Sequence, residues 1–162
     1  MIFKRLITNI HIAIIESINF YDKILNNMNE YLTDAIVLGR DDLNEFDSRV
    51  DLYTERYGRL RAKAKSIRKS TSKLAGHLEP LMLSRVRLVD KNDIIVVDSL
   101  SMDRFEFLRS SSQAFQAGLR LLDFFRQNIL EGEQDLVLWH WLKNSLTTGE
   151  ISYADLNKRL GF

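Results

Sequence analysis

The 162-residue sequence contains no cysteine, which excludes disulfide bonds, thiolate nucleophiles and thiolate-ligated zinc. It has only one proline and seven glycines, so long uninterrupted secondary-structure elements are expected. It also lacks an excess of charge of either sign. The net charge is +1, which excludes a generally basic nucleic-acid binder. A role with nucleic acid would have to come from a local basic stretch.

Signatures of catalysis and of metal binding are missing as well. The three histidines lie on separate segments, at His11, His77 and His140. None has a second ligand at the spacing of a metal-binding motif, and the chain has no glycine-rich phosphate loop. The acids Asp41, Asp42 and Glu45 could hold a divalent ion, but acids are also favoured where a helix begins. We adopt the second interpretation and predict no metal, no cofactor and no catalytic residue.

Apolar residues between Leu43 and Leu78 recur at alternating spacings of three and four, which is typical of the buried seam of a helix. The positions are Leu43, Phe46, Val50, Tyr53, Tyr57, Leu60, Ala64, Ile67, Thr71, Leu74 and Leu78. Only Thr71 is polar. The pattern predicts one long helix over this range.

The preceding segment, Ile2 to Leu38, has the same spacing with a wider apolar stripe. Gly39 would end this helix, and Asp42 with Glu45 would form a capping box at the start of the next one. A short connection between two long helices predicts an antiparallel hairpin. We therefore expect residues 1–79 to form a long, coiled-coil-like helical hairpin.

The remaining sequence divides into a connector and a helical part. Pro80 should end the second long helix. Within the connector, residues 80–102, alternating and β-branched residues indicate a small β-hairpin near 83–97 or an irregular segment. Residues 103–162 predict helices over about 104–130, 134–146 and after Ser152, packed on the hairpin. Asp103 with Glu106 would cap the first of these helices, and Ser152 with Asp155 would cap the last. The expected fold class is mainly α, organised as one domain overall.

Charge is sorted along the central segment. Residues 41–55 carry six acids and one base, whereas residues 56–73 carry eight bases and no acid. The basic run is either a solvated helix surface or a site for nucleic acid or an acidic partner. The candidate binding residues are Arg56, Arg59, Arg61, Lys65, Arg68 and Lys69. Tyrosine and tryptophan are enriched at interfaces. The candidate interface aromatics are therefore Tyr53, Tyr57, Trp139 and Trp141.

The first functional hypothesis is a non-enzymatic interaction protein, such as an adaptor, assembly factor or regulatory subunit, acting through helix surfaces. Its acidic and basic ends would pair two antiparallel copies, so a homo-oligomer or a complex with another protein is expected. The alternatives are a nucleic-acid-associated protein using residues 56–73 and an enzyme whose site forms between chains. The apolar run near the beginning is too short and polar to span a bilayer. A cytoplasmic location is expected.

Overall fold

The computed structural model describes residues 30–90 and 92–161. The strands are β1 (Glu30–Asp42), β2 (Ser48–Thr54), β3 (Gly58–Ala64), β4 (Leu83–Asp90) and β5 (Ile94–Asp103). The helices are the 3-10 turn η1 (Ala75–His77), α2 (Glu106–Arg109), α3 (Ser112–Asn128), α4 (Leu136–Thr148) and α5 (Tyr153–Leu160). The expected mainly α fold is therefore wrong, because five strands between Glu30 and Asp103 build a sheet.

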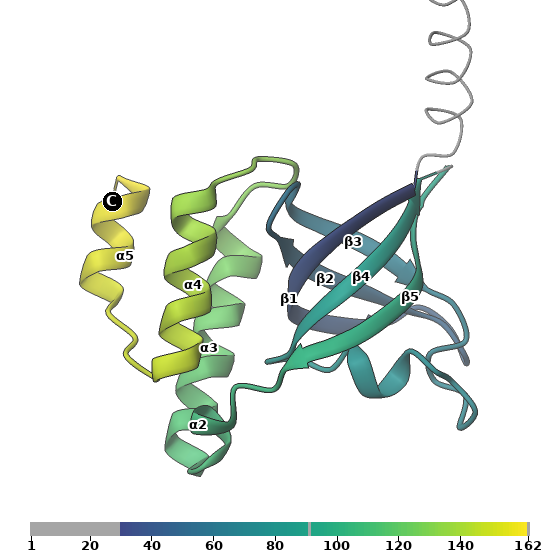
Figure 1. The fold of residues 1–162 in the computed structure, drawn as a ribbon, viewed down its shortest axis with the longest axis horizontal. Helices are drawn as coiled ribbons and strands as arrows, with labels where there is room; N and C mark the ends of the chain where they lie inside the picture. Colours follow the sequence, from purple (N-terminus) through teal and green to yellow (C-terminus); the bar gives the residue numbers. More distant parts are fainter. Residues whose placement is uncertain (1–29, 91, 162) are drawn as a thin grey trace, which may run out of the picture. The chain divides into compact units, whose positions relative to one another are not determined.

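The five strands close into a barrel in the order β1-β2-β3-β5-β4. The pairs β1–β2, β2–β3 and β4–β5 are antiparallel, whereas β3 and β5 run parallel through Lys63–Ile95 and Ala64–Val96. The amide of Val37 on β1 donates to the carbonyl of Met82, just before β4, at 2.9 Å. A closed five-stranded barrel with this order is an OB-fold. Figure 1 shows α3, α4 and α5 beside one side of the barrel.

The long helix predicted from Leu43 to Leu78 is absent. This range contains a loop, β2, β3 and the connection that carries η1. Val50, Leu60 and Ala64 belong to the apolar seam that predicted the helix, yet they fill the barrel interior. Leu43 and Phe46 belong to the same seam and are exposed on the loop before β2. The 3–4 spacing therefore arose from two alternating strands and a loop, not from one helix face.

The helix predicted over residues 2–38 is also wrong in the part that the structure describes. Residues 2–29 lie outside the described residues, and residues 30–38 belong to β1. Ala35 and Val37 face the barrel interior, whereas Ile36 and Leu38 pack against the helices. Because β1 is covered on both sides, its apolar residues follow one another without alternation. The predicted helix break at 39–42 is instead a bulged end of this strand.

The β-hairpin predicted near 83–97 is present as β4 and β5, which are longer than expected and form part of the barrel. The third predicted helix is divided into α2 and α3. The helix α3 begins after the N-cap Ser111, whose side chain accepts a hydrogen bond from the amide of Ala114. The expected N-cap Asp103 instead accepts from the amide of Phe105 at 2.7 Å. Ser152 caps α5 as predicted, accepting from the amide of Asp155.

Two apolar clusters hold this unit together. One fills the barrel, and the other lies between the barrel and the helices. In the second cluster the ring of Tyr53, from β2, contacts Phe125 on α3 edge to face at 5.2 Å between centroids. Trp139 on α4 lies 6.1 Å from the same tyrosine ring. The helices thus cover one part of the outer surface of β1 and β2 and leave the rest open.

Candidate nucleic-acid interface

The outer face of β2 and β3 carries three side-chain pairs that lie directly opposite each other. The Cα partners are Arg49 with Lys63, Asp51 with Arg61, and Tyr53 with Arg59. Residues alternate across a strand, so these outward positions lie between the inward-facing residues of the barrel core. The three pairs form a row that begins under the helices and ends at the open end of the face.

The end of the row under the helices is buried and fully paired. The Arg59 guanidinium donates to both carboxylate oxygens of Asp51, at 2.9 and 2.8 Å. It also donates to the carbonyl of Ile129 at 2.9 Å. The hydrogen bonds to Asp51 raise the pKa of Arg59 above its ordinary value, which keeps its charge. These contacts join the barrel to the end of α3.

The open end of the row is basic. Arg49 is exposed and makes no ion pair within the described part of the chain. Its cross-strand partner Lys63 lies 3.4 Å from the carboxylate of Asp47. Like charges directly opposite each other weaken a pair of strands. The two cations, one of them paired with Asp47, offer positive charge to an anionic ligand at this end of the row.

The loop between β1 and β2 is folded by two of its own side chains. The Asn44 side-chain oxygen accepts from the amides of Phe46 and Asp47, at 2.9 and 2.8 Å. The Asp47 carboxylate accepts from the amide of Ser66, in the chain after β3, at 2.8 Å. That hydrogen bond and one from the Asn44 amide hold the pKa of Asp47 below its ordinary value. The loop is thereby tied to the connection between β3 and β4.

The β1–β2 loop, held in this way, carries an exposed aromatic ring among basic side chains. Phe46 is 43% exposed at the tip of the loop. The Lys69 ammonium lies 4.9 Å from the centre of its ring, and Arg68 donates to the carbonyl of Asn44 at 2.7 Å. An exposed aromatic ring beside cations is the combination by which single-stranded nucleic acid is bound, through base stacking and phosphate contacts.

A polar groove of about 290 Å³ runs between the β1–β2 loop and the β4–β5 turn. Its floor is the basic end of the row on β2 and β3. The lining residues are Leu43, Asn44, Arg49, Arg61, Lys63, Asp93 and Ile94. We call this hollow the basic groove. The β2–β3 face and these two loops are where OB-folds bind oligonucleotides.

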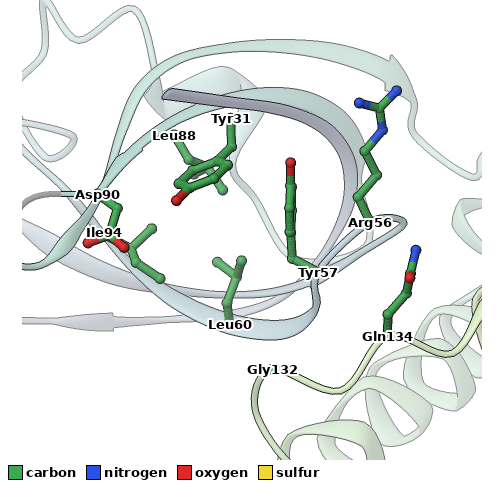
Figure 2. A pocket seen from close by; sticks show the side chains of 9 residues that line it. All are labelled: Tyr31, Arg56, Tyr57, Leu60, Leu88, Asp90, Ile94, Gly132 and Gln134. Atoms are coloured by element: carbon green, nitrogen blue, oxygen red, sulfur yellow. The ribbon is translucent and has the colours of Figure 1, made fainter. Parts of the chain in front are cut away.

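A second hollow of about 460 Å³ lies at the end of the barrel. Figure 2 shows Tyr31, Tyr57, Leu60 and Ile94 around it, with Arg56 and Gln134 beyond Tyr57. The rings of Tyr31 and Tyr57 meet edge to face at 5.1 Å. We call this hollow the tyrosine pocket. Its lining also includes Leu88, Asp90 and Gly132.

The turn that carries Tyr57 is fixed by a buried hydroxyl. The Thr54 side chain accepts from the amide of Tyr57 at 3.0 Å and donates to the carbonyl of Gly58 at 2.8 Å. The segment between α3 and α4 packs on this turn, with the Gln134 amide donating to the carbonyl of Glu55 at 3.2 Å. These contacts fix the backbone of the turn and thereby the place from which the Tyr57 side chain extends.

The basic residues selected from the sequence do not lie together. Arg61 is exposed on the β2–β3 face, Lys65, Arg68 and Lys69 are exposed in the connection after β3, and Arg56 is exposed on the β2–β3 turn. Arg59 is buried in the contacts with Asp51. The aromatic candidates divide as well. Tyr53 and Trp139 are buried in the core, whereas Tyr57 and Trp141 are half-buried.

Sequence reasoning did not select Arg49, Lys63, Phe46 or Tyr31. A signal for Lys63 was present, because residues 59–65 alternate strictly between basic and apolar side chains. On a strand this alternation places Arg59, Arg61 and Lys63 on one face. Arg49 and Tyr31 had no comparable signal. Their places depend on strand pairing across the barrel.

Two further features concern metal ions and membranes. Among residues 30–90 and 92–161, no group of three or more histidine, aspartate or glutamate side chains is arranged to hold a metal ion. None of the helices in the described part of the chain has the length and apolar character needed to cross a bilayer.

Comparison with known proteins gives a consistent result. Residues 28–102 match the family model described as recombination protein O N terminal. The chain is 44% identical over 137 residues to a DNA repair protein RecO from Myxococcus xanthus, covering 83% of this chain and 56% of the relative. It is 32% identical over 118 residues to a DNA repair protein RecO from Thermodesulfovibrio yellowstonii, covering 72% of this chain and 47% of the relative.

These relatives overturn the first functional hypothesis, a helical adaptor acting through helix surfaces. Residues 30–79 form strands, loops and a 3-10 turn instead of long helices, so the coiled-coil interpretation is wrong and the pairing of two antiparallel hairpins loses its basis. The nucleic-acid alternative agrees better with the relatives. The chain spans about half the length of the curated relatives it matches. Its barrel matches the N-terminal family of recombination protein O, and the similarity to DNA repair proteins RecO extends beyond the barrel into the helices.

Proposed function

We propose that this chain is a RecO-type DNA repair protein whose barrel binds single-stranded DNA in the basic groove. The family match and the relatives named DNA repair protein RecO support this role. The observation that carries it is the cross-strand pair Arg49 and Lys63 on the β2–β3 face of an OB-fold. The proposed activity is binding, and it requires no catalytic side chain.

Each part of the site has a defined task in this proposal. Arg49, Arg61 and Lys63 contact phosphates along the groove, because their side chains lie in one row. Phe46 stacks on a base at the edge of the groove. Lys65, Arg68 and Lys69, selected from the sequence, extend the basic surface beyond Phe46. Arg59 acts at a distance from DNA by holding the face against the helices.

The experiment is fluorescence anisotropy of a labelled oligo(dT) 20-mer titrated with the chain over a range of salt concentrations. The double variant Arg49→Ala/Lys63→Ala should weaken binding and reduce the slope of log affinity against log salt by about 1.4, roughly 0.7 for each phosphate contact. The matched control is Arg120→Ala/Lys158→Ala, which removes the same charge from exposed positions on α3 and α5.

The control should bind with the slope of the unaltered chain. Equal losses in the two double variants would mean that binding follows net charge and not this groove, which contradicts the proposal. Absence of salt-dependent binding by the unaltered chain would contradict it directly. A DNA repair role also implies work in the compartment that holds the chromosome, so we propose a cytoplasmic location and contacts with other repair proteins.

A further inference from the structure

The tyrosine pocket has walls suited to a planar ring. Tyr31, Tyr57, Leu60 and Ile94 present aromatic and aliphatic carbon to a hollow of about 460 Å³. This volume lies within the range of pockets that bind small organic ligands. The two tyrosines meet edge to face, so each keeps a ring face available for another contact.

Four polar side chains around the pocket have no partner among the described residues, whereas a fifth, Gln134, donates to the carbonyl of Glu55 at 3.2 Å. Within residues 30–90 and 92–161, the hydroxyls of Tyr31 and Tyr57 make no hydrogen bond. The side chains of Asp90 and Arg56 make no hydrogen bond or ion pair there either. A few polar groups around an apolar hollow set the orientation of a bound ligand. Here they comprise one anion, one cation, two hydroxyls and the amide of Gln134.

The tyrosine pocket adjoins the basic groove. Ile94, at the start of β5, lines both hollows. On β3, Leu60 lines the pocket and the next residue, Arg61, lines the groove. Within the described residues, β3 pairs with β5 through Lys63 and Ala64, at the end of β3, and the first half of β3 is not paired with β5. The shared lining residue places the pocket within reach of a polymer held in the groove.

We propose that the tyrosine pocket binds one base of the single-stranded DNA that lies in the basic groove. This inference rests on the proposed function. The base stacks on a tyrosine ring, and the Asp90 carboxylate accepts a hydrogen bond from a base N–H. Arg56, beyond Tyr57, contacts a phosphate of the same strand. The groove thus binds the phosphates of the strand, and the pocket binds one of its bases.

The experiment compares an oligo(dT) 12-mer with an abasic 12-mer that carries the same phosphates. Tyr57→Leu keeps an apolar side chain but removes the ring. It should weaken binding of oligo(dT) about tenfold and leave binding of the abasic 12-mer and the salt slope unchanged. The control Tyr57→Phe keeps the ring and should bind oligo(dT) like the unaltered chain. Far-UV circular dichroism and thermal unfolding report whether each variant is folded.

A second measurement uses the unaltered chain. A 12-mer with one central 2-aminopurine should become shielded from acrylamide quenching when it is bound. Equal affinity of Tyr57→Leu and the unaltered chain for oligo(dT), or a bound 2-aminopurine that acrylamide still quenches freely, overturns the pocket. If Arg49→Ala/Lys63→Ala still reduces binding in that case, the proposed function stands without it. If the unaltered chain binds no DNA, both the proposed function and the role of the tyrosine pocket are contradicted.

Discussion

Arg59 and Asp51 are joined by two hydrogen bonds of 2.9 and 2.8 Å beneath the helices, on the outer face of the barrel. Both side chains are almost completely buried, at 7% and 3% exposure. Arg126 on α3 lies 3.5 Å from the same carboxylate. The pair therefore connects β2, β3 and α3 through one buried anion.

Replacing Asp51 should destabilise the fold strongly. Asp51→Ala leaves the Arg59 charge buried without its partner, which costs about 3–5 kcal/mol in comparable cases. The matched control is Asp123→Ala, at an exposed position on α3, and it should change the free energy of unfolding by less than about 0.5 kcal/mol. Urea unfolding followed by circular dichroism measures both variants. Similar small losses in the two would contradict a structural role for the pair.

Gly58 should tolerate no side chain. Its φ is +64°, and an added Cβ would collide with the carbonyl oxygen of Glu133. Gly58→Ala therefore combines backbone strain with a clash against the α3–α4 segment. Gly132→Ala is the control, because its φ is +83° with nothing within 4 Å of an added Cβ.

The control should lose about 1–2 kcal/mol from the left-handed backbone alone. Gly58→Ala should lose clearly more, measured by the same urea unfolding. If both alanine variants lose the same amount, the contact between the β2–β3 turn and Glu133 is not tight.

Stability should fall on the alkaline side because of Tyr53. Burial, with a further contribution from the charge of Asp135, raises the pKa of Tyr53 above its ordinary value. An unfolded chain releases this proton at about pH 10, whereas the folded chain keeps it. Since the unfolded state then binds fewer protons, the free energy of unfolding decreases as pH rises above about 10.

Tyr53→Phe keeps the ring but has no proton to lose. Urea unfolding at pH 8, 10 and 11 should therefore show a steeper alkaline decrease for the unaltered chain than for the variant. All other tyrosines and lysines titrate in both proteins, so their contribution cancels in the difference. Parallel decreases would show that Tyr53 ionises in the folded state as easily as in the unfolded one.

Phe46 should contribute to DNA affinity without contributing to the fold. Its ring is 43% exposed on a loop whose shape is set by Asn44 and Asp47. Phe46→Ala should weaken binding of oligo(dT) by about 1–3 kcal/mol, the usual contribution of one stacked base. Phe46→Tyr should retain it. Anisotropy titrations give the affinities, and an unchanged affinity in Phe46→Ala would place base stacking elsewhere.

Part of this fold could be predicted from the sequence and part could not. A β-hairpin near 83–97 was one of two interpretations of the connector, because its branched residues are separated by turn residues at 90–93, and the structure has it as β4 and β5. The N-cap Ser152 was predicted because capping is local. In contrast, the run from Ala35 to Leu38 has no alternation, since the barrel covers one side of the strand and the helices cover the other.

The candidate site was partly visible. The alternation in residues 59–65 is typical of a strand, but the same residues also fit the 3–4 spacing over residues 43–78, which predicts a helix. On a helix the bases scatter around the surface, so they could not be recognised as one face. The pairing of Arg49 with Lys63 requires a register that no local pattern encodes. The position of Tyr31 against Tyr57 depends in the same way on closure of the barrel.

The most direct measurement of the central claim is photo-crosslinking of the chain to a single-stranded oligonucleotide that carries 5-iododeoxyuridine, followed by mass spectrometry of the crosslinked peptides. Binding in the basic groove and the tyrosine pocket predicts crosslinked peptides that contain Phe46 or Tyr57. Crosslinks confined to α3, α4 and α5 would contradict it.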